Sequence, residues 1–193
     1  GKHYNYGAAK DATKVPSHLG LSNLVGELNN GSVQVLIIKD ANPVYAVPQA
    51  KFAEAMKKAS FTVALASSRN ETTAHANLVL PITHDLESWG EINTYAGLDM
   101  LQQPVMTPRW EARQAEDLLI ELMRDGNEEA FATASFREFL KARWIEKNGA
   151  DAADGEKFWR DSLRAGGRFN LSEQGEDVAL SANLPDDLFS EIK

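Results

Sequence analysis

Three short apolar runs alternate with amphipathic segments in the first part of the chain, and this alternation constrains the fold more than any other feature. The runs occupy 33–38, 61–66 and 77–81, and the last of them stops at its proline. Near-continuous apolar strands are typical of parallel sheets that helices cover on both faces. The alternation therefore predicts an α/β fold, with a Rossmann-like open parallel sheet, flanking helices and a helical extension.

Helical periodicity fills the intervals between these runs. A stripe of Leu21, Leu24, Val25 and Leu28 predicts a first helix, with Ser17 as its cap. The same reasoning predicts a second helix that carries Phe52, Ala55, Met56 and Ala59. Further helices are predicted at 71–76 (short), 114–124, 128–147 (one long helix) and 156–165. A last strand is predicted near 178–180. We expect an N-terminal segment (1–16), an α/β domain (17–124) and a helical extension with a polar tail (125–193).

Charge and composition narrow the function classes. The 193 residues carry a net charge of −8 without a basic cluster, which argues against nucleic acid and anionic membranes as partners. The chain has no cysteine, so it offers no thiolate for an iron–sulfur cluster and no disulfide. It begins with Gly rather than Met and without the apolar core of a signal peptide, and we expect it to be a domain cut from a longer protein.

Candidate functional residues follow from the predicted topology. Ligands of open α/β sheets bind beyond the carboxyl ends of the strands, which selects the loops 39–48, 67–72 and 81–104. The last of these loops shows no regular periodicity. Together the loops hold Asp40, Asn42, Asn70, Glu71, Thr72, His84, Asp85, Glu87, Gly90 and Asn93. This placement alone does not define a chemistry, because every fold of this type has such loops.

The sequence offers weak support for three specific chemistries. Asp40 follows a strand like a phosphoacceptor aspartate, but the acidic pair that such a site needs is absent, and a hydrogen bond within its own loop is the simpler interpretation. His75 and His84 lack further ligands at metal-binding spacing. Asp85 and Glu87 form a carboxylate pair that fits a solvated loop better than an acid–base site.

Three stretches in combination resemble a known family. They are "VQVLIIKDANPVYAVP" at 33–48, "FTVALASSRNETTAHANLVLP" at 61–81 and "LESWGEINTYAGLDMLQQPVMTPRWEARQAEDLLIEL" at 86–122. They are similar to the third domain of the molybdopterin oxidoreductase (dimethyl-sulfoxide-reductase) superfamily. The third stretch resembles most the molybdopterin-like iron–sulfur subunit of alternative complex III and related quinone oxidoreductases, as does "FWRDSLRAGG" at 158–167.

The resemblance implies a cofactor face. By motif, Asn42, Glu71, Thr72, Glu87 and Gly90 would lie at or near a pterin dinucleotide. Three features depart from the family pattern. Asp40 replaces a glycine where the pyrophosphate would approach, Asn77 replaces an aspartate, and "WGEINTYAGLD" at 89–99 lacks the arginine that catalytic members carry in this segment. A carboxylate beside a pyrophosphate is electrostatically unfavourable. We therefore expect no cofactor in this chain, whereas the parent protein could hold molybdopterin guanine dinucleotide and iron–sulfur clusters.

The resemblance also implies a setting. It favours a non-catalytic scaffold domain in the electron-transfer subunit of a membrane respiratory complex, on the periplasmic side, with other domains and subunits as partners. The alternative is a pterin-binding domain of a catalytic molybdenum or tungsten enzyme. For 84–104 we expect either a partner-facing surface that exposes Trp89 and Leu101, or a loop whose Trp89 packs on this domain.

Overall fold

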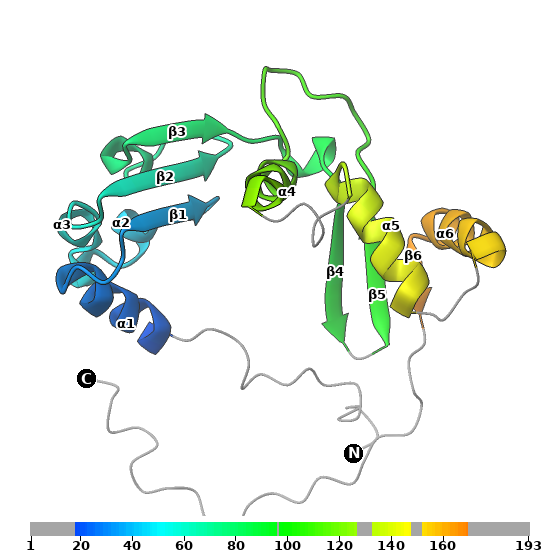
Figure 1. Cartoon of the computed structure of the whole chain (residues 1–193), viewed down its shortest axis with the longest axis horizontal. Coiled ribbons are helices and arrows are strands. Elements are labelled where there is room, and N and C mark those ends of the chain that lie inside the picture. Colours follow the sequence, from blue (N-terminus) through cyan, green and yellow to red (C-terminus); the bar gives the residue numbers. More distant parts are fainter. Residues whose placement is uncertain (1–17, 96, 127–132, 148–151, 170–193) are drawn as a thin grey trace, which may run out of the picture.

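The computed structural model describes residues 18–95, 97–126, 133–147 and 152–169. Within these ranges the chain forms two three-stranded sheets, each with its own helices (Figure 1). The first sheet consists of β1 (Val35–Lys39), β2 (Phe61–Ala66) and β3 (Leu78–Pro81). The second consists of β4 (Gly90–Tyr95), β5 (Leu98–Gln102) and β6 (Gly167–Phe169).

The first sheet is parallel throughout, in the order β1-β2-β3. This confirms the predicted α/β fold class and the three strands, since apolar runs at this spacing pair in parallel when helices connect them. The register places Ile37 opposite Val63, and Val63 opposite Leu78. These three side chains therefore share one face of the sheet.

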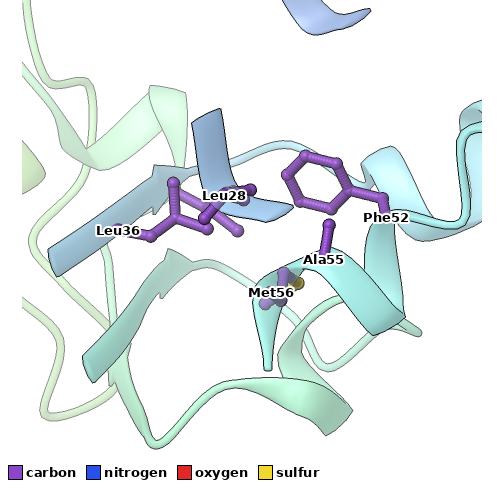
Figure 2. Close-up of a cluster of buried hydrophobic side chains, with 6 residues drawn as sticks. Leu28, Leu36, Phe52, Ala55 and Met56 are labelled. Carbon is purple, nitrogen blue, oxygen red and sulfur yellow. The ribbon is translucent and has the colours of Figure 1, made fainter. Parts of the chain in front are cut away.

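Helices α1 (His18–Asn29) and α3 (Phe52–Met56) cover the opposite face. Their apolar side chains meet those of β1 in the first core, which Figure 2 shows around Phe52 and Leu36. The fully buried members include Leu28, Phe52 and Met56. The predicted stripe of the first helix is thus directed at the sheet, whereas the helix predicted to extend to Ala59 ends at Met56.

The face that carries Ile37 is covered over only half its length. Helix α4 (Ala115–Gly126) packs on the carboxyl-terminal half, where Leu65, Ile82 and Ala115 are buried together. Val35 and Ile37 remain 57% and 41% exposed. The prediction that these strands are buried on both faces is therefore wrong for this half. The strands follow one another in the order β1-β2-β3, so right-handed crossovers place both connecting segments on the same face of the sheet. Neither connection covers the face that carries Ile37.

Short helical turns make up the remaining connections of the first sheet. They are α2 (Pro43–Ala46), η3 (Pro48–Ala50), η4 (Thr73–His75) and η5 (Asp85–Glu87). Prolines at the first positions of α2 and η3 suit a helix start, because their missing N–H would have no partner there. The helix predicted at 71–76 is confirmed only as the single turn η4.

The second sheet is antiparallel, and the prediction of an irregular loop at 81–104 is wrong. Strands β4 and β5 form a hairpin whose turn contains Gly97, with a φ of +79°. That backbone conformation is accessible to glycine at little cost. Strand β6 then pairs with β5, although some seventy residues of sequence separate them.

Helices α5 (Phe136–Lys147) and α6 (Ala152–Ala165) complete the second module. They bury Leu140, Trp144 and Trp159 with Leu101 of β5 in the second core. Trp89 packs against this core, its ring centroid 6.3 Å from that of Trp159. The expectation that Trp89 and Leu101 face a partner is therefore wrong. Trp89 packs within this chain, although on the second core rather than the parallel sheet.

Helix α5 is shorter than the single helix predicted at 128–147. It starts at Phe136, and residues 133–135 before it are not helical. The hydroxyl of Ser135 accepts a hydrogen bond from the amide of Glu138, as a capping residue does. The predicted cap at Ser17, the segment 1–16 and the strand near 178–180 lie outside the described residues.

Candidate functional site

The candidate site lies at the carboxyl edge of the parallel sheet, where all three strands end on the same side. In Figure 1 this edge points toward α4 and the antiparallel sheet. A cavity of about 230 Å³, here called the crevice, opens between the two modules. Its lining consists of Lys39, Asp40, Ile82, Thr83, Asp85, Ser88, Trp89, Gly90, Glu91, Gln102, Ala115, Glu116 and Phe136.

Three of the five predicted site residues form one network. The side-chain oxygen Oδ1 of Asn42 accepts hydrogen bonds from the Thr72 hydroxyl at 2.8 Å and the Thr72 amide at 3.2 Å. The Asn42 side-chain amide donates to Glu71 at 2.7 Å. Thr72 is fully buried, and its hydroxyl accepts from the Val44 amide. The network ties the loop after β1 to the loop after β2.

This network sets the charge state of Glu71. The hydrogen bond from Asn42 lowers the pKa of Glu71, and a backbone hydrogen bond lowers it further. Glu71 is thus a carboxylate at neutral pH. The polar side chains of Asn42 and Thr72 already form hydrogen bonds with each other and with Glu71. These hydrogen bonds explain the geometry of the two loops, and no ligand is needed to explain it.

Glu87 and Gly90 belong to a second group, around η5. The Glu87 carboxylate accepts from the backbone amides of Arg109 at 2.9 Å and His84 at 3.1 Å. These two bonds, the Arg109 bond first, lower the pKa of Glu87. Gly90 starts β4 opposite Gln102 and also lines the crevice. The role of the five residues as cofactor contacts stays a prediction.

Asp40 has a backbone conformation that glycine favours. Its φ is +45°, in the left-handed region, where few residues other than Gly, Asn and Asp are found. Its amide donates to the Leu65 carbonyl at 2.8 Å, and the Ser67 hydroxyl contacts its carboxylate at 3.3 Å. The conformation explains why a glycine suits this position, as the family pattern implies. Asp40 meets the same backbone requirement and adds a negative charge to the crevice.

The charges of the crevice do not fit an anionic pyrophosphate. Lys39 is the one cationic residue of its lining, and its ammonium already pairs with Glu116 at 2.7 Å. Burial raises the pKa of Glu116, but the hydrogen bond from Lys39 and further hydrogen bonds outweigh it, so the net shift is downward. Asp40, Asp85 and Glu91 add three more carboxylates to the lining, and of these Glu91 forms an ion pair with Arg143. Since a pyrophosphate would meet net negative charge here, this site is a poor match for a pterin dinucleotide.

Three residues that join the two modules were not predicted from the sequence. Gln114, Glu116 and Asp117 all lie at the start of α4, and each reaches a different element. Gln114 binds the backbone of Trp89, Glu116 pairs with Lys39 of β1, and Asp117 accepts from the amide that opens α5. One signal in the sequence concerns them, a polar Q-A-E-D stretch just before an apolar helical stripe. Such a stretch indicates a helix start but not its partners.

Other candidate chemistries gain no support. Within the described residues, no three His, Cys, Asp or Glu side chains gather closely enough to hold a metal ion. The His84 ring nitrogen Nδ1 instead accepts the Leu86 amide at 3.2 Å. Asn70 and Thr73 bond to each other across η4. None of the helices in the described part has the length and apolar character needed to cross a membrane.

Fold and site together define an open parallel α/β domain, with its candidate loops at the carboxyl edge, joined to an antiparallel module. The family model described as molybdopterin oxidoreductase matches residues 3–125, which is more than half of the chain. The chain therefore belongs to the molybdopterin oxidoreductase family, and the resemblance found in its motifs is confirmed.

The chain is also similar to a curated protein. The chain is 34% identical over 125 residues to the "Menaquinone reductase, molybdopterin-binding-like subunit" of Nitratidesulfovibrio vulgaris Hildenborough. The alignment covers 61% of this chain and 18% of the relative. The chain thus spans less than a fifth of that protein's length, and it is similar to a subunit of a quinone reductase.

Proposed function

We propose that this chain is a non-catalytic scaffold domain of a molybdopterin-oxidoreductase-like subunit, cut from a longer parent that belongs to a membrane quinone oxidoreductase. The observation that carries the proposal is the crevice, where Lys39 is neutralised by Glu116 while Asp40 and Asp85 remain. An anionic dinucleotide bound in the crevice would need unpaired donors or cations there. The similarity to a menaquinone reductase subunit supports the quinone setting.

In this proposal the residues at the carboxyl edge of the sheet hold the two modules together and take no part in a reaction. The start of α4 is joined to β1 through Glu116, to the residue before β4 through Gln114, and to α5 through Asp117. Such a joint holds the two modules in fixed orientation. Electron transfer would run through iron–sulfur clusters in other segments of the parent, on the periplasmic side of the membrane. Partner domains and subunits of the complex would bind the surfaces that this chain leaves exposed.

A second candidate is a cofactor-binding domain of a catalytic molybdenum or tungsten enzyme. The family match and the ordered Asn42–Glu71–Thr72 network favour it. Under this alternative the dinucleotide would lie along those loops and gain its cationic contacts from other segments.

Elemental and pterin analysis of the native complex separates the two candidates. Molybdenum and tungsten are measured by mass spectrometry, and pterin by the fluorescence of its oxidised derivative, in the complex purified through a tag on this chain. We expect iron but neither molybdenum, tungsten nor pterin in stoichiometric amount. Stoichiometric pterin would establish the cofactor-binding alternative. As a control, a known pterin-containing oxidoreductase passes through the same procedure.

A further inference from the structure

The antiparallel sheet has an apolar face on the side opposite its two helices. Side chains of a strand alternate between the two faces of a sheet. Leu101 of β5 faces the helices, since it is buried with Trp144 of α5 and Trp159 of α6. Its neighbours in the alternation, Leu98 and Met100, therefore point to the other side of the sheet, away from α5 and α6 (Figure 1).

The two neighbouring strands extend this face. Ile92 of β4 lies opposite Met100, and Phe169 of β6 lies opposite Leu98. Side chains that lie directly opposite each other in an antiparallel pair share one face. Ile92 and Phe169 are 47% and 56% exposed, and Leu98 and Met100 are partly exposed. We call these four residues the outer sheet face, and a continuous apolar face of this kind indicates a surface made for contact.

The chain itself continues from the outer sheet face. Phe169 ends β6 and is the last residue that the structure describes, and residues 170–193 follow it in the sequence. The stretch 170–177, here called the spacer, is polar apart from Leu171. The stretch 178–192, here called the tail segment, holds the large apolar residues Val178, Leu180, Leu184, Leu188, Phe189 and Ile192. The tail segment thus brings apolar side chains that gain free energy when they leave water.

The length of the spacer permits contact between the tail segment and the outer sheet face. The eight residues of the spacer span at most about 28 Å when extended. The three strands occupy only about 10 Å across, because neighbouring strands lie about 4.8 Å apart. A short tether of this kind also gives an effective concentration of about 1 mM. Even a weak contact within the chain is therefore populated.

We propose that the tail segment docks on the outer sheet face of its own chain and covers Ile92, Met100 and Phe169. The contact removes apolar surface from water on both partners. A second copy of the chain fits less well, since each copy brings a net charge of −8 to the contact and has no tether. Because face and segment belong to one chain, the contact forms whether or not the chain is a scaffold domain.

The absence of cysteine in the 193 residues allows one introduced thiol to report on the face. Ile92→Cys places this thiol on the outer sheet face. Ile37→Cys places it on the parallel sheet and is the matched reporter, because Ile37 is 41% exposed and Ile92 is 47% exposed. Each reporter is introduced into the full chain and into a chain that ends at Asp177. The rate of maleimide labelling is measured in each protein.

A further variant keeps the full length of the chain. Leu184→Ser, Leu188→Ser and Phe189→Ser together remove large apolar side chains from the tail segment without shortening it. As the control, Glu173→Ser and Glu176→Ser change the spacer instead. Circular dichroism verifies the fold of every protein, and the triple serine variant decides the question if the shortened chain does not fold.

We expect Ile92→Cys to react about tenfold more slowly in the full chain than in the shortened chain. A contact populated about ten to one over its open form reduces the labelling rate by that factor. The triple serine variant should react as fast as the shortened chain, whereas the spacer variant should keep the slow rate. Ile37→Cys should react at one rate in all these proteins.

Equal rates for Ile92→Cys in the full chain, the shortened chain and the triple serine variant would overturn the proposal. So would a tail segment that slows Ile37→Cys as much as Ile92→Cys, because the contact would then not be specific to the outer sheet face. The labelling is repeated at several protein concentrations. Protection of Ile92→Cys that rises with concentration would identify a second copy as the occupant and would also overturn the proposal.

Discussion

Gln114 holds the backbone of Trp89 through both ends of its side-chain amide. Its Nε2 donates to the Trp89 carbonyl at 2.8 Å, and its Oε1 accepts the Trp89 amide at 3.0 Å. Gln114 is buried, and the pair connects the start of α4 with the residue that precedes β4. The parallel and antiparallel modules are thus joined by a side chain that imitates one rung of a sheet.

Replacement of this clamp should destabilise the protein. Gln114→Leu keeps the approximate volume but leaves both Trp89 backbone groups without their partner. We expect the free energy of unfolding to decrease by about 1–3 kcal/mol, the usual effect of unsatisfied buried polar groups. Urea unfolding followed by tryptophan fluorescence measures it. Gln49→Leu, on an exposed position of η3, is the matched control. Equal stability of the two variants would show that the clamp contributes nothing.

Asn42 and Thr72 should be energetically coupled in their contributions to the free energy of unfolding. Asn42→Leu and Thr72→Val each remove the bonds between Asn42 Oδ1 and the Thr72 hydroxyl. We expect each single variant to lose about 1–3 kcal/mol of unfolding free energy. The double variant should lose less than the sum, by about 0.5–3 kcal/mol, because neighbours in one network are not additive. Strict additivity in chemical unfolding would contradict the network.

Asp40 should tolerate glycine but not a β-branched residue. Its φ of +45° is strained for most side chains. Asp40→Val is expected to destabilise the protein by about 1–3 kcal/mol, the usual strain of a non-glycine residue in the left-handed region. Asp40→Gly should stay within about 1 kcal/mol of the parent, since relief of strain offsets the greater freedom of the unfolded chain. Thermal unfolding of the two variants decides, and a stable Asp40→Val protein would show that the loop relaxes.

The sequence predicted the parts of the fold that depend on local pattern. Strands β1, β2 and β3 are apolar runs, and α4 carries an apolar stripe, so neighbouring residues alone reveal them. The hairpin β4–β5 could not be predicted from a local sequence pattern, because the partners of its polar residues are distant in the sequence. Glu91 binds the Trp144 ring nitrogen at 2.9 Å, and Asp99 binds Lys147 at 2.7 Å. Partners about fifty residues away leave no periodicity in the strand itself.

The candidate site divides in a similar manner. Family motifs located Asn42, Glu71 and Thr72, and the structure brings these three together. Gln114 was missed, because a glutamine at a helix start shows nothing of the backbone it will bind. The division of the chain at residue 124 stays a prediction. It falls inside α4, which continues to Gly126, and the Asp117 carboxylate accepts the Phe136 amide across that point at 2.6 Å.

The ion pair between Lys39 and Glu116 makes the free energy of unfolding depend on pH in the acidic range. The pKa of Glu116 in the folded protein lies below its unfolded value of about 4.3. A lowered pKa contributes stability that is fully present above the unfolded value and is lost as pH falls through the folded value. We expect the free energy of unfolding to remain level from about pH 7 to 5 and to decrease below about pH 4. Urea unfolding at each pH measures this decrease.

Glu116→Gln should make this decrease in unfolding free energy less steep, because the variant has no carboxyl group to protonate there. Glu54→Gln, an exposed residue of α3, should leave the profile unchanged. Identical profiles for Glu116→Gln and the parent would show that the pair with Lys39 does not stabilise the crevice.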